Sequence, residues 1–150
     1  MQRAVAPEHV PPAHILVIDD NPGDVQLLRL ALAEQDRPFT LQVLRDGAEA
    51  LDFVEQQRVS RENTPCVIVL DLHLPKHEGL AVLSKIRRTV ELAHVHVVVL
   101  TSSATPHEVN EARELGVVWY REKPTDVDEF LEVARRIFEA CDQRTIVDAA

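Results

Sequence analysis

Short apolar runs recur along the chain and alternate with amphipathic segments. Runs at 14–18, 66–70 and 95–100 are almost continuously apolar, a pattern typical of strands buried on both faces of a parallel sheet. A run at 39–44 alternates more, as an edge strand does, and the run at 117–120 is shorter. The pattern therefore predicts five strands.

The segments between these runs repeat apolar residues at spacings of three and four, which predicts helices. The expected helices span 23–35, 47–57, 79–88, 105–116 and 126–141. Thr105 is the expected N-cap of the fourth, with Pro106 at its first position and Gly116 at its end, and Asp126 is the expected cap of the last. Alternating strands and helices predict an α/β fold, a doubly wound five-stranded parallel sheet with right-handed crossovers and five helices.

The 150 residues are of the size of one domain. We expect a flexible tail at 1–12, the domain at 13–141 and a C-terminal tail at 142–150. The formal net charge is −9, with 25 acidic and 16 basic residues and no basic block. Nucleic acid binding relies on Lys and Arg to neutralise phosphates, so the charge argues against it.

The chain also lacks features of export or membrane insertion. No apolar run approaches the roughly 18 residues of a membrane span, and the first residues have no apolar signal-peptide core. We expect a cytoplasmic protein with no membrane partner. In that reducing environment Cys66 and Cys141 are expected to be separate thiols, with a thiol pair as the alternative.

Polar side chains follow the strands at the edge where open parallel sheets form their sites. Asp19 and Asp20 follow the first strand, Asp71 the third, Thr101 the fourth and Lys123 the fifth. If the first and third strands are neighbours, three carboxylates meet and repel one another, and a hard divalent cation relieves the repulsion. A sparse set of oxygen ligands that leaves room for water suits Mg²⁺.

The same residue types can hold a phosphoryl group. The metal, the Lys123 ammonium and the Thr101 hydroxyl could each engage one of its oxygens. A carboxylate can itself be the nucleophile, which would give an acyl phosphate.

Together these residues resemble the receiver domains of two-component response regulators, the CheY-like, flavodoxin-like fold, over roughly 13–141. The resemblance implies the strand order 2-1-3-4-5. The D-x-x-x-P-x-x-x-G spacing is met by Asp71, Pro75 and Gly79. The matching pieces are VIDDN (17–21), DLHLPKHEG (71–79), LTSS (100–103) and YREKP (120–124).

The resemblance implies a role for each acidic residue. Asp71 would be the phosphoacceptor. Asp20 would bind Mg²⁺ directly and Asp19 mostly through water, and the backbone carbonyl of His73 would be a further metal ligand. The positions of His73 and Ser103, two residues after Asp71 and Thr101, would tune how fast water removes the phosphate.

The resemblance also implies a conformational switch. Lys123 would pair with the phosphoryl oxygens, next to a Lys123–Pro124 bond expected to be cis. Thr101 would swing to hydrogen-bond the phosphoryl group, and Tyr120 would turn inward into the space that it leaves. Phosphorylation would thus shift a two-state equilibrium that is read at the face of the fourth helix, fifth strand and fifth helix.

A narrower resemblance is carried by DDNPGDVQLLRLAL (19–32) and RRTVELAHVHVVVLTSS (87–103). They look like the stand-alone receivers, without an output domain, that serve bacterial phytochrome histidine kinases. Those proteins typically carry N-P-x-D after the acid pair, matched by Asn21, Pro22 and Asp24. The match departs at HEGLAVL, where that subfamily more often has an acidic residue before the glycine, for which Glu78 is a fair substitute, and polar residues after it. The implied partners are a phytochrome-type kinase and an unknown downstream protein, with a homodimer through the switch face as an open alternative.

Other functions fit the residues less well. The implied protein is not an enzyme with a separate substrate, although it would catalyse its own phosphotransfer and dephosphorylation. A Mg²⁺-dependent aspartyl-phosphate hydrolase of the haloacid-dehalogenase type needs a second acid where His73 stands. A receiver served by a non-photoreceptor kinase and a degenerate scaffold receiver remain alternatives. A zinc site at His73 and His77 is disfavoured because Pro75 lies between them.

Overall fold

The sheet of the computed structural model has the predicted order. The structure describes residues 11–149, and their side chains as far as residue 142. Within them, all strands are parallel in one sheet of order β2-β1-β3-β4-β5. The strands are β1 (Ala13–Ile18), β2 (Phe39–Leu44), β3 (Val67–Leu70), β4 (His96–Thr101) and β5 (Trp119–Glu122).

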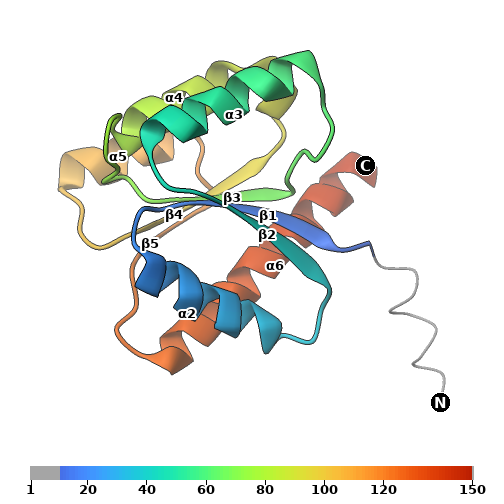
Figure 1. The fold of residues 1–150 in the computed structure, drawn as a ribbon, viewed down its shortest axis with the longest axis vertical. Helices are drawn as coiled ribbons and strands as arrows, with labels where there is room; N and C mark the ends of the chain where they lie inside the picture. The colour runs from blue at the N-terminus through green and yellow to red at the C-terminus, as the bar shows by residue number, and fades with distance from the viewer. Residues whose placement is uncertain (1–10, 150) are drawn as a thin grey trace.

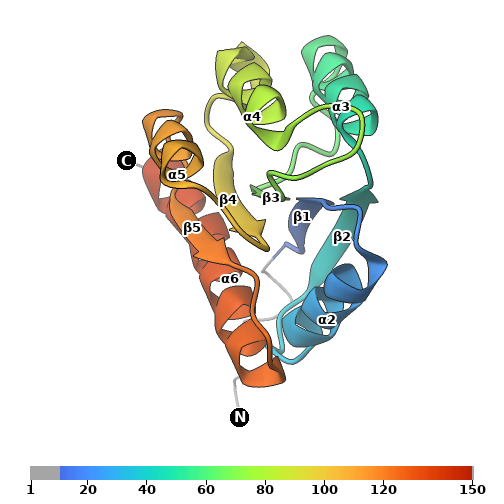
Figure 2. The same ribbon diagram turned by 90° about the vertical axis from the view of Figure 1, so that its left-hand side faces the viewer.

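Helices cover both faces of the sheet, as the predicted doubly wound fold requires. They are α2 (Pro22–Ala33), α3 (Gly47–Val59), α4 (Gly79–Arg88), α5 (Pro106–Glu114) and α6 (Val127–Ala149), with a short 3₁₀ helix, η2 (Val90–Leu92). In Figure 1, α2 and α6 lie on one face, and α3, α4 and α5 lie on the other. Figure 2 views the molecule from the side on which the strands end.

The central strand β3 explains the continuous apolar pattern. All four of its residues are at most 2% exposed. Val67 and Val69 enter the core under α2 and α6, whereas Ile68 and Leu70 enter the core under α3 and α4. Successive side chains of a strand point to opposite faces, so a strand covered on both faces must be apolar at every position.

The predicted caps of α5 and α6 are confirmed. Thr105 forms a capping box with Glu108, and Pro106 begins α5. Gly116 follows that helix with a φ of 80°, a conformation that glycine adopts without steric cost. Asp126 accepts a hydrogen bond of 2.8 Å from the backbone N–H of Glu129 at the start of α6.

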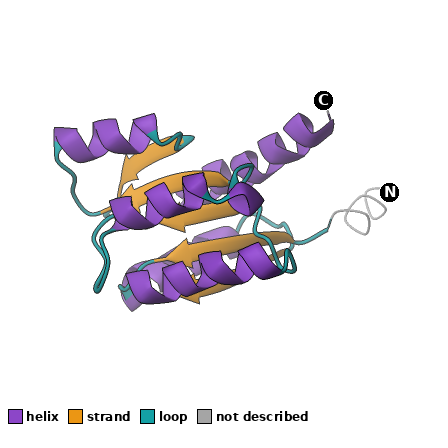
Figure 3. Cartoon of the chain, turned by 90° about the horizontal axis from the view of Figure 1, so that it is seen from above, coloured by secondary structure: helices purple, strands orange, loops and turns teal. Residues whose placement is uncertain are grey.

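The end of the last helix was predicted wrongly. The helix was expected to end at residue 141, with a tail at 142–150, but α6 continues to Ala149. No glycine or proline interrupts this stretch, so nothing in it breaks the helix. Figure 3 shows the last turns of α6 extending past the sheet. Most of the tail predicted at 1–12 lies outside the described residues. Among the described helices, none is long and apolar enough to cross a membrane.

The prediction of two separate thiols was also wrong, because Cys66 and Cys141 form a disulfide. Cys66 immediately precedes β3, and Cys141 lies in α6, which packs over that end of the sheet. Their Cα atoms are 5.1 Å apart, although 75 positions separate them in the sequence. A spacing of that length carries no local signal of contact, so only the packing of α6 on the sheet brings the two sulfurs together.

We expect reduction of this disulfide to lower the free energy of unfolding by about 2–4 kcal/mol, because it releases a long closed loop in the unfolded chain. Urea unfolding with and without a dithiol reductant measures the difference. A variant with Cys66→Ala and Cys141→Ala is the control and should not respond to the reductant. An unchanged urea midpoint for the reduced natural chain would contradict the expectation.

Candidate functional site

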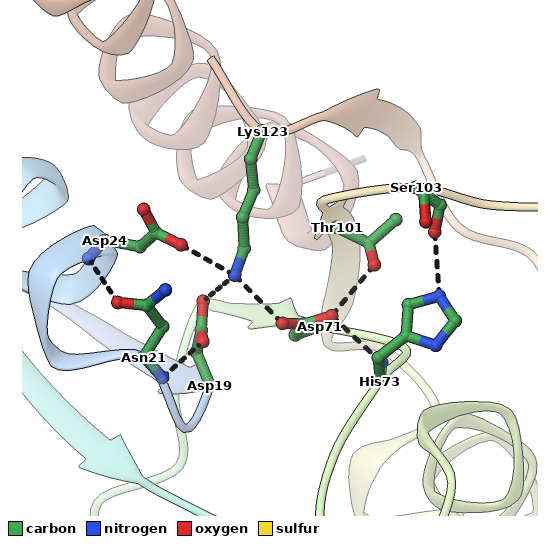
Figure 4. Close-up of polar contacts among 8 residues, drawn as sticks. All are labelled: Asp19, Asn21, Asp24, Asp71, His73, Thr101, Ser103 and Lys123. Carbon is green, nitrogen blue, oxygen red and sulfur yellow. Dashed lines mark hydrogen bonds and ion pairs between the residues drawn. The ribbon is translucent and has the colours of Figure 1, made fainter. Parts of the chain in front are cut away.

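Polar side chains from four strands converge where the strands end (Figure 4). The ends are in register because the Asp71 N–H donates to the Ile18 carbonyl at 3.0 Å, and the Lys123 N–H donates to the Thr101 carbonyl at 2.7 Å. These backbone bonds continue the parallel ladders by one residue beyond each strand. The sheet therefore brings together Asp19, Asp71, Thr101 and Lys123, as the strand-end pattern predicts.

Asp71 lies at the centre of the cluster and is 4% exposed. Its Oδ1 accepts hydrogen bonds from the Thr101 hydroxyl at 2.8 Å and from the His73 N–H at 2.9 Å. Its Oδ2 accepts a hydrogen bond from the Lys123 ammonium at 2.9 Å. Both carboxylate oxygens are thus held in place by neighbouring donors.

The predicted group of three carboxylates is formed. Asp19, Asp20 and Asp71 each place a carboxylate oxygen within 4.8 Å of the others. Burial is the main cause that raises the pKa of Asp19; the Asn21 N–H and Lys123 act against it, and the charge of Asp71 adds to it. Asp20 is exposed, so water can reach the group. An all-oxygen set with excess negative charge and access to water fits a hard divalent cation.

Lys123 is the cation of the cluster, and its side chain is only 9% exposed. Its Nζ lies 2.9 Å from Asp71, 3.0 Å from Asp19 and 2.9 Å from Asp24. Burial alone would lower the pKa of Lys123, but the hydrogen bonds to Asp24, Asp71 and Asp19 outweigh burial and raise the pKa above its usual value. Lys123 is therefore charged at any physiological pH.

The contact of Asp24 with Lys123 was not predicted from the sequence. Asp24 was noted only as the last residue of the N-P-x-D motif. Asn21 caps α2 by accepting from the Asp24 N–H at 3.2 Å, and the cap places the Asp24 carboxylate in the first turn, against Lys123. The motif was a usable signal, but the contact depends on how α2 packs beside α6 on the same face of the sheet.

His73 lies on the side of Asp71 that faces away from Lys123 (Figure 4). Its ring Nε2 lies 2.8 Å from the Ser103 carbonyl oxygen, so Nε2 carries the hydrogen, and 3.8 Å from Glu108. The side chain thereby joins the loop after β3 to the loop after β4. The structure brings the His73 N–H and ring to the site, while the proposed metal contact of the His73 carbonyl stays a prediction.

The loop after β3 depends on Gly79. Its N–H donates to the Leu72 carbonyl at 2.8 Å, and a Cβ at this position would collide with the backbone of Leu72 and Asp71. The Pro75 carbonyl accepts from the Gly47 N–H at 3.0 Å, which ties the loop to the start of α3. The proline and the glycine of the D-x-x-x-P-x-x-x-G pattern therefore shape the loop that carries His73.

The two aromatic residues of β5 face opposite cores. Trp119 packs with the α2 and α6 core, whereas Tyr120 packs with the core under α3, α4 and α5. Burial, with Glu108 and Glu122 nearby, raises the pKa of Tyr120. Its hydroxyl is buried and makes no hydrogen bond with the described residues. The switch roles of Thr101 and Tyr120 stay predictions.

The peptide bond before Pro124 differs from the expectation. No cis peptide bond occurs within residues 11–149, so the Lys123–Pro124 bond is trans. The trans isomer is the lower-energy form of an X–Pro bond. Lys123 reaches its three carboxylates from that geometry.

Known proteins resemble the chain over most of its length. The family model for the response regulator receiver domain matches residues 15–135. Response regulator Rcp1 of Synechocystis sp. is 34% identical over 131 residues, 87% of this chain and 89% of Rcp1. The Mn²⁺-bound structure of Rcp1 has a TM-score of 0.74 at 33% identity and covers 84% of this chain and 91% of its own.

Two further solved structures bear on the narrower resemblance. The phosphorylated cyanobacterial phytochrome response regulator RcpA is 30% identical with a TM-score of 0.76, over 86% of this chain and 93% of its own. The bacteriophytochrome response regulator RtBRR is 35% identical with a TM-score of 0.70, over 87% and 78%. The predicted resemblance to phytochrome-associated regulators is therefore confirmed.

We expect Asp19→Asn to raise the free energy of unfolding by about 1 kcal/mol near pH 7 in metal-free buffer. The pKa of Asp19 is raised above its ordinary 3.8, so its ionised form costs stability above that pH, and the cost disappears below it. Lys123 keeps two carboxylate partners in the variant.

Urea unfolding at neutral and acidic pH measures this difference. The advantage of the variant over the natural chain should shrink as the pH falls from 7 through the raised pKa towards 3.8. A variant that is less stable than the natural chain at pH 7, or a stability advantage that grows on acidification, would contradict a raised pKa of Asp19.

Proposed function

This chain belongs to the response regulator receiver domain family, and we propose that it accepts a phosphoryl group from a histidine kinase on Asp71. The observation that carries the proposal is the buried Asp71 carboxylate, held between the Lys123 ammonium and the Thr101 hydroxyl. We propose residues 13–141 as the receiver unit, a span that contains the family match at 15–135. Asp71 as phosphoacceptor accounts for an acid placed directly at the end of a core strand.

In the proposed reaction, a carboxylate oxygen of Asp71 attacks the phosphorus of the donor. The bond from phosphorus to the donor's imidazole nitrogen breaks, and its electron pair leaves with the imidazole. The product is an aspartyl phosphate. Lys123 offers a fixed positive charge to the phosphoryl oxygens, and Thr101 offers a hydroxyl, so both stabilise charge without a large rearrangement.

We propose that Asp19, Asp20 and Asp71 hold Mg²⁺, with the backbone carbonyl of His73 as a further ligand. When bound, the cation would neutralise charge on the phosphoryl oxygens. The three clustered carboxylate oxygens and the exposure of Asp20 support this assignment. The Mn²⁺-bound form of the relative Rcp1 supports it as well, because Mn²⁺ and Mg²⁺ both prefer oxygen ligands.

Phosphorylation is proposed to act on the chain through Thr101 and Tyr120. Thr101 now donates to Asp71 Oδ1, and a phosphoryl group would offer it a stronger acceptor. Tyr120, whose hydroxyl makes no hydrogen bond with the described residues, would follow inward. The face formed by α5, β5 and α6 would change with them, with about 1–3 kcal/mol available to shift the equilibrium.

His73 and Ser103 are proposed to set the lifetime of the phosphate. The imidazole and the Ser103 carbonyl stand together on the side of Asp71 opposite Lys123. Water that hydrolyses the aspartyl phosphate would have to approach the phosphorus in line with the bond that breaks. We propose that its path passes the His73 imidazole and Ser103. The hydrogen bond between the two loops narrows that approach.

The proposed donor is a phytochrome-type histidine kinase in the cytoplasm. The likeness to RcpA and RtBRR, a phytochrome and a bacteriophytochrome response regulator, supports this assignment. The proposed targets of the switch are an unknown downstream protein and a second copy of the chain, both through α5, β5 and α6.

We expect the chain to take up phosphate from a small acyl-phosphate donor only with Mg²⁺, and expect Asp71→Asn to abolish the uptake. Mass spectrometry of the intact protein measures the fraction of chains that carry a phosphoryl group. Asp52→Asn, which removes an exposed acid of α3, is the matched control and should be labelled normally. Label retained in Asp71→Asn would contradict the assignment. Turnover of phosphate esters would instead support a hydrolase.

We expect preferential phosphotransfer from a light-sensing histidine kinase. A profile that presents the chain to a panel of purified, autophosphorylated kinases measures the initial rate of transfer from each one. The chain should be labelled fastest by a phytochrome-type kinase, because RcpA and RtBRR, which it resembles over most of its length, are phytochrome-associated response regulators. Faster transfer from a non-photoreceptor kinase would overturn this pairing but not the receiver function.

A further inference from the structure

The ammonium of Lys123 has three hydrogens and three carboxylate partners. Asp19, Asp24 and Asp71 lie at 2.9–3.0 Å from Nζ, so each N–H has one acceptor. Figure 4 shows Nζ between them, with Asp24 on the side of α2. Lys123 is thus saturated before any phosphoryl group arrives.

The three partners are not equivalent towards a cation. Asp19 and Asp71 belong, with Asp20, to the group of carboxylates whose oxygens lie within 4.8 Å of one another. Asp24 is not part of that group among the described residues. A carboxylate oxygen that coordinates a divalent cation is a weaker partner for an ammonium, because the cation takes its electron density and repels the positive charge. Metal binding therefore weakens two of the three contacts and leaves the third intact.

Asp24 is also firmly placed. It lies in the first turn of α2, where an acid interacts favourably with the helix dipole. The Asn21 side chain accepts a hydrogen bond of 3.2 Å from the Asp24 backbone N–H. Val25 and Leu28, which follow in α2, are buried in the core. The Asp24 carboxylate is 25% exposed, so water screens its attraction for Lys123 only in part. A rigid helix end thus presents a charge to the lysine from outside the metal group.

We propose that Asp24 is a positioning residue that keeps the Lys123 ammonium beside Asp71 when a divalent cation occupies the carboxylates of Asp19, Asp20 and Asp71. The inference rests on the proposed function, because it gives the held lysine its task of meeting the phosphoryl oxygens. The four acidic residues of the site thereby have two separate roles. One acid orients the lysine, and the other three hold the cation.

The proposal predicts that the effect of removing Asp24 depends on the metal. Without a cation, Asp24→Ala leaves Lys123 two carboxylate partners, and the amine should stay protected. With saturating Mg²⁺, the same variant leaves the amine without an uncommitted partner, and it should become accessible. Asp24→Asn keeps an oxygen acceptor but loses the charge, so it should behave between the natural chain and Asp24→Ala.

The measurement is the rate of acylation of Lys123 by a water-soluble succinimidyl ester, quantified by mass spectrometry of the peptide that contains it. The other two lysines, Lys76 and Lys85, report reagent activity within each sample. We expect Asp24→Ala to react about ten-fold faster at Lys123 with saturating Mg²⁺, because Asp24 is then the last carboxylate free to hold the amine; the factor corresponds to about one charge-assisted hydrogen bond. It should react within about two-fold of the natural chain without the metal, because two such bonds remain.

Asp52→Ala, which removes an exposed acid of α3, is the control for net charge and should leave Lys123 protected in both conditions. Equal acceleration of Asp24→Ala with and without Mg²⁺ would overturn the proposal, as would no acceleration in either. The assay uses no phosphodonor, so its result is separate from phosphorylation of Asp71. A chain that is phosphorylated normally but shows no metal-dependent exposure refutes this proposal alone.

Discussion

The contact between the Lys123 ammonium and three carboxylates is the interaction on which the site depends. Four acids, Asp19, Asp20, Asp24 and Asp71, surround one lysine, so the cluster carries excess negative charge in a largely buried place. Lys123 compensates part of it and stays charged, while burial, with a smaller contribution from the charge of Asp71, still raises the pKa of Asp19. The remaining negative charge supports the proposed cation site, and we expect it to cost stability while no cation is bound.

The sheet gives the cluster a rigid support. Asp71 follows a strand of four fully buried residues, and that strand is bonded on both sides by β1 and β4. One further backbone hydrogen bond joins Asp71 to β1, and another joins Lys123 to Thr101 of β4. These bonds fix the positions of the Asp71 and Lys123 backbones along the strand direction. Close packing on both faces leaves little freedom for these backbones to adjust. Movement is therefore left to the side chains and to the loops.

The loops connect the site to the surface. His73 binds the Ser103 carbonyl and approaches Glu108, which also takes part in the capping box of α5. A change at Asp71 can thus reach the start of α5 through a chain of direct contacts. Tyr120 lies in the core beside the same helix, with a buried hydroxyl that has no hydrogen-bond partner among the described residues. Such a hydroxyl costs little to move, which suits a side chain proposed to change position.

The strands, the caps Thr105 and Asp126 and the strand-end residues could be predicted from the chain alone. Those features follow from local periodicity, from capping chemistry and from a motif whose Pro75 and Gly79 shape one loop. The contact of Asp24 with Lys123, the disulfide of Cys66 with Cys141 and the trans bond before Pro124 emerge only once the helices and loops are packed. Contacts between distant segments depend on helix packing, in which a shift of a few ångströms makes or breaks a contact, and no local pattern of residues encodes such distances.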